Sequence, residues 1–98
     1  MTESNQSAIL PGSPVGALLE AIRDALAIPY PRTVNDAAAY LDERCNRATE
    51  VLLQVKRVLG GADDADAIEW GTGYLRRQCE LYEAKRTYQA APDRGPER

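Results

Sequence analysis

Two cysteines carry the most reactive side chains in this sequence. Cys45 and Cys79 each belong to a regularly spaced apolar series, and the two positions fall at one level of the helical hairpin that these series predict. We expect them to face each other as reduced thiols. A redox pair is the functional hypothesis. Two small buried hydrophobic side chains are the simpler one, because a buried thiol is inert unless its pKa is lowered.

Few other side chains could support catalysis. Histidine is absent, which removes the commonest general base and the commonest metal ligand. The sequence has no phosphate-binding loop and no dinucleotide fingerprint. An acidic cluster lacks the glycine and glutamate that an EF-hand loop needs, and we expect it to cap a helix start: Asp63, Asp64, Asp66 and Glu69. We therefore predict no enzymatic activity, no cofactor and no bound metal.

Four arginines fall near one level of the predicted hairpin and could form a basic band: Arg44, Arg47, Arg76 and Arg77. Acidic residues are interleaved with them, and the net charge of the chain is −3. Binding to nucleic-acid phosphates favours an undiluted basic surface, so we expect a solvated face with ion pairs instead. Glu43 and Arg47 have the spacing of such a pair, and we expect Arg47 on the outer face.

These residues would be positioned by three helices. Ser13 and Pro14 predict the start of a helix over about 14–28, and Pro29 with Pro31 predicts its end. Thr33 is expected to cap a second helix over about 34–59, which Gly60 and Gly61 terminate. A third helix is predicted over about 64–89. The fold class is therefore all-α, a long antiparallel helical hairpin with a short N-terminal helix packed across its open end.

The second helix carries a heptad pattern over nearly four repeats, with apolar residues spaced alternately four and three apart. Its members are Val34, Ala38, Leu41, Cys45, Ala48, Leu52, Val55 and Leu59. We expect this series to pack against a similar one on the third helix, namely Ala65, Ile68, Thr72, Leu75, Cys79 and Tyr82. Leu52 would then lie inside the core, where Leu52→Asp would unfold the protein.

The third helix has a further apolar stripe, formed by Trp70, Tyr74, Leu81 and Tyr88, nearly opposite its first one. The short N-terminal helix would cover only part of it. We therefore predict a partner interface at Trp70, Tyr74, Val51 and Val58, for a protein partner or a second copy. The alternative is that Ile9 and Leu10 fold over this patch.

The chain is expected to comprise a flexible arm (1–12), a single helical domain (13–90) and a disordered charged tail (91–98). Its N-terminus lacks the features of a signal peptide, and no apolar run is long enough to span a bilayer. We expect a cytoplasmic protein without membrane association.

Three segments of the sequence resemble small helical proteins of actinobacteria and their mobile elements. The segments are Ala27-Ile28-Pro29-Tyr30-Pro31, Asp36 to Tyr40, and Trp70 to Arg76, and the resemblance covers about residues 18–80. This resemblance implies no particular activity. The length and hairpin are also similar to the secreted helical hairpins exported by ESX-type machines. However, Gly73 and Gly71 do not complete the Trp-x-Gly turn with Trp70, and Arg86 and Pro92 stand where the export signal has an acid.

The sequence thus favours a non-enzymatic protein–protein interaction or assembly module that presents helix faces. The alternatives are a small nucleic-acid-associated regulator that uses the arginine band, and an ESX-type secreted hairpin.

Overall fold

The structure is a computed structural model, and it describes residues 12–91. Three α-helices follow one another in this part of the chain: α2 (Pro14–Leu26), α3 (Ala37–Leu59) and α4 (Ala65–Lys85). A short 3-10 turn, η1 (Val34–Asp36), precedes α3. The predicted all-α, three-helix fold is confirmed. The predicted arm and tail lie almost wholly outside the described residues.

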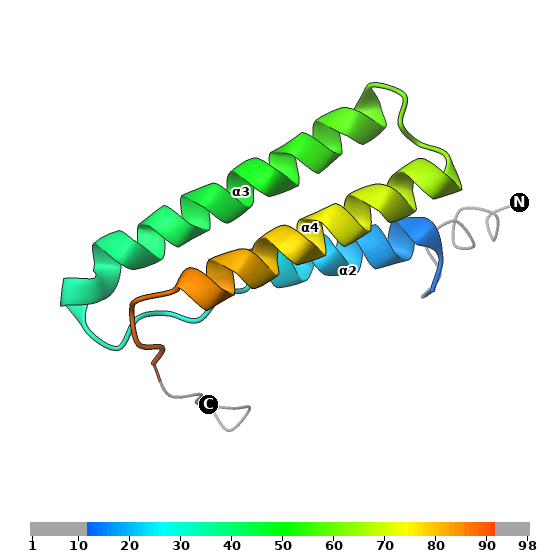
Figure 1. Ribbon diagram of the computed structural model, residues 1–98. Coiled ribbons are helices and arrows are strands. Elements are labelled where there is room, and N and C mark those ends of the chain that lie inside the picture. Colours follow the sequence, from blue (N-terminus) through cyan, green and yellow to red (C-terminus); the bar gives the residue numbers. More distant parts are fainter. Residues whose placement is uncertain (1–11, 92–98) are drawn as a thin grey trace, which may run out of the picture.

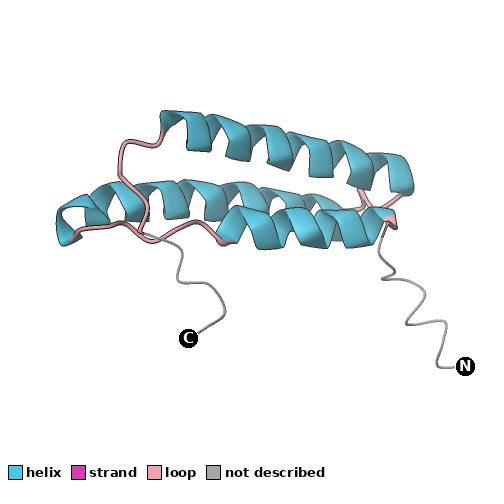
Figure 2. Cartoon of the chain, turned by 90° about the horizontal axis from the view of Figure 1, so that it is seen from below, coloured by secondary structure: helices cyan, strands magenta, loops and turns pink. Residues whose placement is uncertain are grey.

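The three helices lie side by side, with α3 and α4 antiparallel and α2 parallel to α4 (Figures 1 and 2). We expected the N-terminal helix to reach only the level of Leu75. In the structure Ala21 and Ala25, in the second half of α2, pack against Leu75, and α2 begins near the start of α4. The main apolar partner of α4 is therefore α2.

Local signals in the sequence define the helix ends. The Ser13 hydroxyl accepts a hydrogen bond from the Gly16 amide (3.0 Å), and the Asp64 carboxylate accepts one from the Ala67 amide (2.8 Å). Both side chains satisfy amides that the first turn of a helix leaves free. Gly61 takes a positive φ of 116° after α3, which a residue with a side chain rarely adopts. The predicted Thr33 cap is wrong, because its hydroxyl contacts the Asp36 carboxylate rather than a backbone amide.

The apolar core consists of two clusters. The first lies between α2 and α4, with Ala21, Ala25 and Leu75 at its centre and Val51 of α3 packed against it. The second closes the open end of the hairpin and contains Ile28, Tyr40 and Tyr88. Tyr40 and Tyr88 meet edge to face, with their ring centres 6.0 Å apart, which is a favourable aromatic arrangement.

The chain leaves the helix earlier than predicted, at Lys85 instead of about residue 89. The segment after α4 is extended and pairs with the connection between α2 and α3. We call the paired residues, 29–32 and 88–91, the terminal clasp. The Arg32 amide donates to the Gln89 carbonyl (2.9 Å), and the Ala91 amide donates to the Tyr30 carbonyl (2.7 Å). The Tyr88 hydroxyl donates to the Pro29 carbonyl (2.9 Å). These bonds fix both chain segments against the second core cluster.

The orientation of α3 is opposite to the predicted one. Its buried residues are Tyr40, Glu43, Arg47 and Gln54, whereas the whole predicted heptad series faces outward. Heptad spacing identifies a face that favours burial but does not identify what buries it. Because α2 already covers the apolar face of α4, α3 contacts α4 through polar side chains that pair with one another.

Candidate interaction surface

The heptad residues of α3, together with Val34 of η1, form an apolar strip on the outside of the domain, which we call the outer stripe. Leu52 at its middle is 51% exposed, Leu41 is 54% exposed and Leu59 is 82% exposed. The expectation that Leu52 lies in the core is therefore wrong. The members of the outer stripe are Val34, Ala38, Leu41, Cys45, Ala48, Leu52, Val55 and Leu59, and each is exposed.

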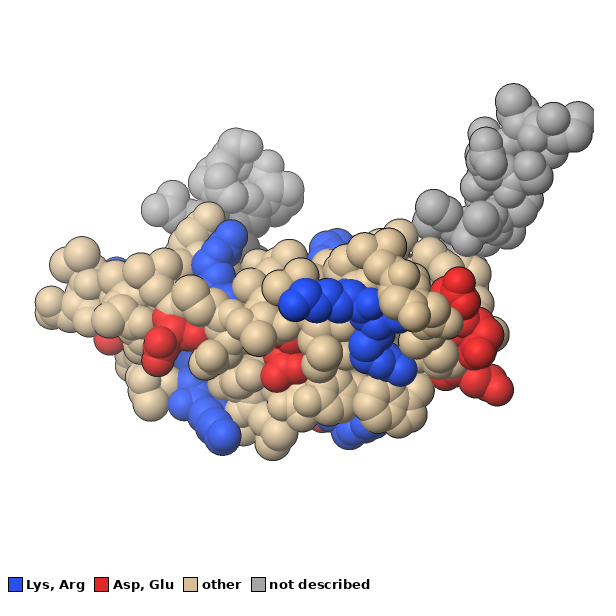
Figure 3. All heavy atoms as spheres, turned by 90° about the horizontal axis from the view of Figure 1, so that it is seen from above, with Lys and Arg blue, Asp and Glu red and all other residues tan. Residues whose placement is uncertain are grey.

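Charged residues are sparse along this face. Figure 3 views the molecule from the side of α3, where uncharged surface runs along the helix with isolated basic and acidic side chains. Acidic side chains gather instead at the end where the α3–α4 loop lies. Asp42 and Lys56 are exposed on α3 and occupy positions next to the outer stripe. A surface of this kind is typical of one helix of a coiled coil, in which charged residues flank an apolar seam.

The two cysteines do not face each other, so this prediction is wrong. Cys45 belongs to the outer stripe and is exposed, while Cys79 is half-buried against the cluster of Ala21, Ala25 and Leu75. Burial raises the pKa of the Cys79 thiol, with Arg47 and Arg76 acting in the opposite direction. A raised pKa lowers the fraction of nucleophilic thiolate, so Cys79 is suited to packing rather than to redox chemistry.

Beneath α3 lies an ion cluster formed by Glu43, Arg47 and Arg86. Arg47 Nε donates to Glu43 Oε2 at 2.9 Å, and Arg86 donates to both Glu43 oxygens, at 2.8 and 2.6 Å. Arg47 also donates to the backbone carbonyls of Ala25 (3.3 Å) and Cys79 (3.4 Å). It therefore ties α3 to the last turn of α2 and to α4. A cation beside the final carbonyls of a helix is favourable, because they form the negative end of the helix dipole.

The ion cluster determines the charge state of its carboxylate. The Arg86 guanidinium holds the pKa of Glu43 below its ordinary value, Arg47 acts in the same direction, and burial opposes both. The same contact with Glu43 raises the pKa of Arg86. Glu43 is therefore ionised and fully engaged with two cations, an arrangement suited to holding helices together.

The four arginines that were predicted to form a basic band do not lie together on one exposed surface. Arg47 is 5% exposed and belongs to the ion cluster, contrary to the expectation of an outer position. Arg76 pairs with Asp24 of α2 at 2.8 Å, and Arg44 donates to the Tyr40 hydroxyl at 3.1 Å. Arg77 is exposed. Since one of the four is buried and two are engaged within the domain, they present no common basic surface.

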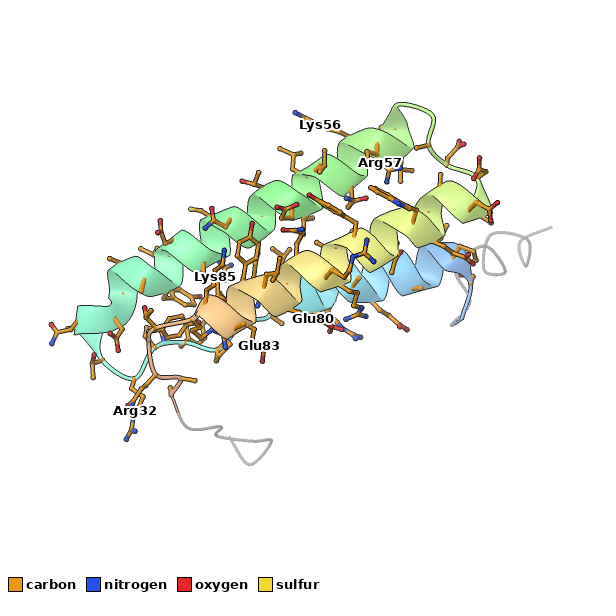
Figure 4. All side chains as sticks on the ribbon, in the orientation of Figure 1. Arg32, Lys56, Arg57, Glu80, Glu83 and Lys85 are labelled. Atoms are coloured by element: carbon orange, nitrogen blue, oxygen red, sulfur yellow. The ribbon has the colours of Figure 1, made fainter. Side chains whose placement is uncertain are left out.

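The predicted interface patch is only partly available. Trp70 is 55% exposed, and its ring stacks on that of Tyr74, with centres 5.4 Å apart and planes inclined by 10°. The Arg57 guanidinium lies 4.7 Å from the Trp70 ring centre, and Figure 4 shows Arg57 reaching toward α4. Val51, however, packs against the core, and Val58 is half-buried. The Trp70–Tyr74 pair stays a predicted contact; Val51 as part of an exposed interface is wrong.

Gln54 is the one buried side chain of the described residues with an unpartnered polar atom, its Nε2. Its Oε1 accepts a hydrogen bond from Arg57 (3.1 Å). Gln54 lies directly over Gly71 of α4, where a β-carbon would come within 3.0 Å of the Gln54 amide. Gly71 is thus a point of close approach between α3 and α4.

A shallow groove of about 260 Å³ runs along the ion cluster between α3 and the end of α4. Its walls include Glu43, Tyr82, Arg86 and Tyr88. The Tyr82 hydroxyl bonds to the Glu50 carboxylate (3.1 Å), and the Tyr88 hydroxyl bonds to Pro29. Contacts within the domain therefore engage the polar atoms of these four side chains.

Within residues 12–91 no three acidic or cysteine side chains come together in a way that could hold a metal ion. In the same part of the chain, no helix combines the length and apolar character needed to cross a membrane. In comparisons with protein families, with curated proteins and with solved structures, nothing matched this chain.

Every residue of the outer stripe was recognisable in the sequence as part of an apolar series, but the series was expected in the interior. The roles of Arg86 in the ion cluster and of Gln54 at Gly71 were not predicted. One signal was available: Tyr40, Glu43, Arg47 and Gln54 recur at helical spacing on the side of α3 opposite the stripe. That face contains the Glu43–Arg47 pair and the Gln54 amide, and a search for hydrophobic spacing does not detect polar residues.

Proposed function

We propose that this chain is a non-enzymatic protein–protein interaction module that binds its partner through the outer stripe of α3. The observation that carries the proposal is an exposed heptad series, seven residues of which lie on one helix, α3, whose opposite face is already packed. Isolated exposed leucines are ordinary, but a contiguous apolar strip on a small domain is typical of a binding surface.

The placement of the polar side chains supports a binding role over a chemical one. The buried ionisable groups on α3, Glu43 and Arg47, are engaged with Arg86 and with backbone carbonyls. Glu43 does line the shallow groove, but both of its oxygens accept hydrogen bonds from arginines, whereas a catalytic carboxylate needs an oxygen that can reach a substrate. The arginines give no support to a nucleic-acid function, because Arg47 is buried and Arg76 is paired with Asp24.

Site-specific photo-crosslinking in cells tests the proposal. A photoreactive amino acid replaces Leu52 in one variant and Leu19 in the other, because Leu19 of α2 has a similar exposure (46%) outside the stripe. We expect covalent protein adducts from position 52 and few or none from position 19, with unchanged helicity in both. Equal yields of adducts at the two positions, or none at position 52, would refute the proposal.

A further inference from the structure

We infer that the partner of the outer stripe is a second copy of this chain, bound with the two α3 helices antiparallel; this inference rests on the proposed function of the stripe. On α3 the heptad series spans about three repeats, from Ala38 to Leu59, which is the shortest length typical of a two-stranded seam. The packed opposite face makes α3 a stable element that is already formed before it pairs.

Side-chain size favours the antiparallel orientation. When the two helices cross near Glu50, Ala48 of one copy meets the partner's Leu52, and Cys45 meets the partner's Val55. These four inner layers each combine a small and a larger side chain, and Leu41 meets the partner's Leu59 in the two end layers. In a parallel pair, identical residues share a layer, so Ala38 and Ala48 would each face another alanine and leave poorly filled layers.

Charge complementarity selects the same arrangement. Asp42 and Lys56 lie on the same edge of the outer stripe, and within the described residues neither makes an ion pair. Figure 4 shows Lys56 directed away from α4. In the antiparallel register Asp42 of each copy lies opposite the partner's Lys56, so two ion pairs form by symmetry. A parallel pair places Asp42 beside the partner's Ala37 and Lys56 beside the partner's Val51, and forms none.

Charge reversal tests this register. In a homodimer of Asp42→Lys, positions 42 and 56 of both copies are all lysine. In a homodimer of Lys56→Asp, the same four positions are all aspartate. We expect each variant to self-associate about tenfold more weakly than the natural chain, measured by sedimentation equilibrium. An equimolar mixture of the two variants restores both ion pairs, and we expect it to form a heterodimer of nearly natural affinity. Glu80→Lys, an equal charge change on the α4 side away from α3, should leave association unchanged (Figure 4).

The two thiols supply an independent readout. Cys45 would be covered in the dimer and exposed in the monomer, while Cys79 is equally half-buried in both. As the protein is concentrated from about 1 μM to about 500 μM, labelling of Cys45 should slow relative to that of Cys79.

Disulfide crosslinking tests the register. Val55→Cys should allow a disulfide between its new thiol and the partner's Cys45, whereas the natural chain should not crosslink through Cys45. The two copies of Cys45 would lie roughly 15 Å apart along the antiparallel helices.

Several results would overturn the inference. A monomer across the whole concentration range would do so, as would a natural dimer joined through two copies of Cys45, or failure of the mixed charge variants to associate. A monomer whose position 52 still crosslinks to a different protein in cells would leave the proposed function standing while removing the second copy as the partner. A monomer without adducts at position 52 would remove both.

Discussion

Arg47 is a charged side chain that is buried at the centre of the domain. It contacts Glu43, the Ala25 carbonyl and the Cys79 carbonyl, so one guanidinium serves all three helices. The planar fork of arginine can make these bonds at once, which a single ammonium cannot. The stability of the α2–α3–α4 junction therefore depends on this residue.

We predict that Arg47→Ala destabilises the domain by about 3 kcal/mol, because it leaves a buried carboxylate with one cation instead of two and a helix end without its donor. Arg47→Lys should recover only part of this loss. Arg44→Ala provides the control, because Arg44 is exposed and its side chain donates a hydrogen bond to the Tyr40 hydroxyl rather than to a carboxylate or a helix end. Urea unfolding followed by circular dichroism gives the three values. Equal losses for Arg44→Ala and Arg47→Ala would contradict the assignment of Arg47 to the junction.

Glu43 provides a second residue-scale prediction, which concerns pH. Since its pKa in the folded domain lies below its ordinary value, Glu43 stabilises the fold above that ordinary value of 4.5. This contribution is lost as the pH falls through the lower, folded-state pKa. The stability difference between the natural chain and Glu43→Gln should therefore be largest near neutral pH and shrink below about pH 4.5. A difference that stays constant across the acid range would show that the carboxylate charge is unimportant.

At the scale of elements, the contact between α3 and α4 at Gln54 and Gly71 leads to a matched pair of glycine substitutions. Gly71→Ala would place a methyl group against the Gln54 amide and the Arg57 guanidinium, so we expect a lower melting temperature. At Gly73 the nearest atom is the mobile end of Arg77 (3.3 Å), so alanine should instead raise stability by up to about 1 kcal/mol through helix propensity. Thermal unfolding of both variants checks the opposite signs.

The helices themselves were largely predictable, because their signals are local. Ser13, Asp64 and Gly61 act where the sequence indicated. Of the series predicted on α4, Ile68 and Leu75 are buried, and Leu75 packs against α2 instead of the predicted series on α3. The end of α4 was missed, because the terminal clasp depends on pairing with a segment far away in sequence. Such pairing leaves no periodic pattern within either segment.

The direction in which α3 faces could not be obtained from hydrophobic spacing. Its apolar series is the most regular in the chain, and in an isolated hairpin it would turn inward. The fold instead buries the side carrying Glu43 and Arg47, because α2 takes the apolar face of α4. The candidate site was therefore found residue by residue in the sequence, but its exposure became evident only once the packing of α2 was known.

For the whole molecule, the proposed pairing makes stability depend on concentration. A partner that binds only the folded chain adds to the free energy of unfolding by mass action. We expect the melting temperature of the natural chain to rise between about 5 μM and about 500 μM protein, and that of Leu52→Asp to stay constant. The fold of Leu52→Asp should persist, since Leu52 is half exposed on a helix whose other face is packed. Loss of helicity in a dilute solution of Leu52→Asp would contradict this and would indicate that Leu52 lies in the core.

The terminal clasp has a consequence for the order of folding. It joins residues 30–32 to residues 89–91, so all of α3 and α4 lies within the chain loop that it closes. Contacts between distant residues are delayed by the entropy of loop closure, whereas the turn at Gly60–Asp64 brings neighbouring segments together at once. The α3–α4 turn should therefore form early, α2 should dock next, and the clasp should close last. Tyr88, which becomes buried only in that final step, would be the side chain that reports its completion.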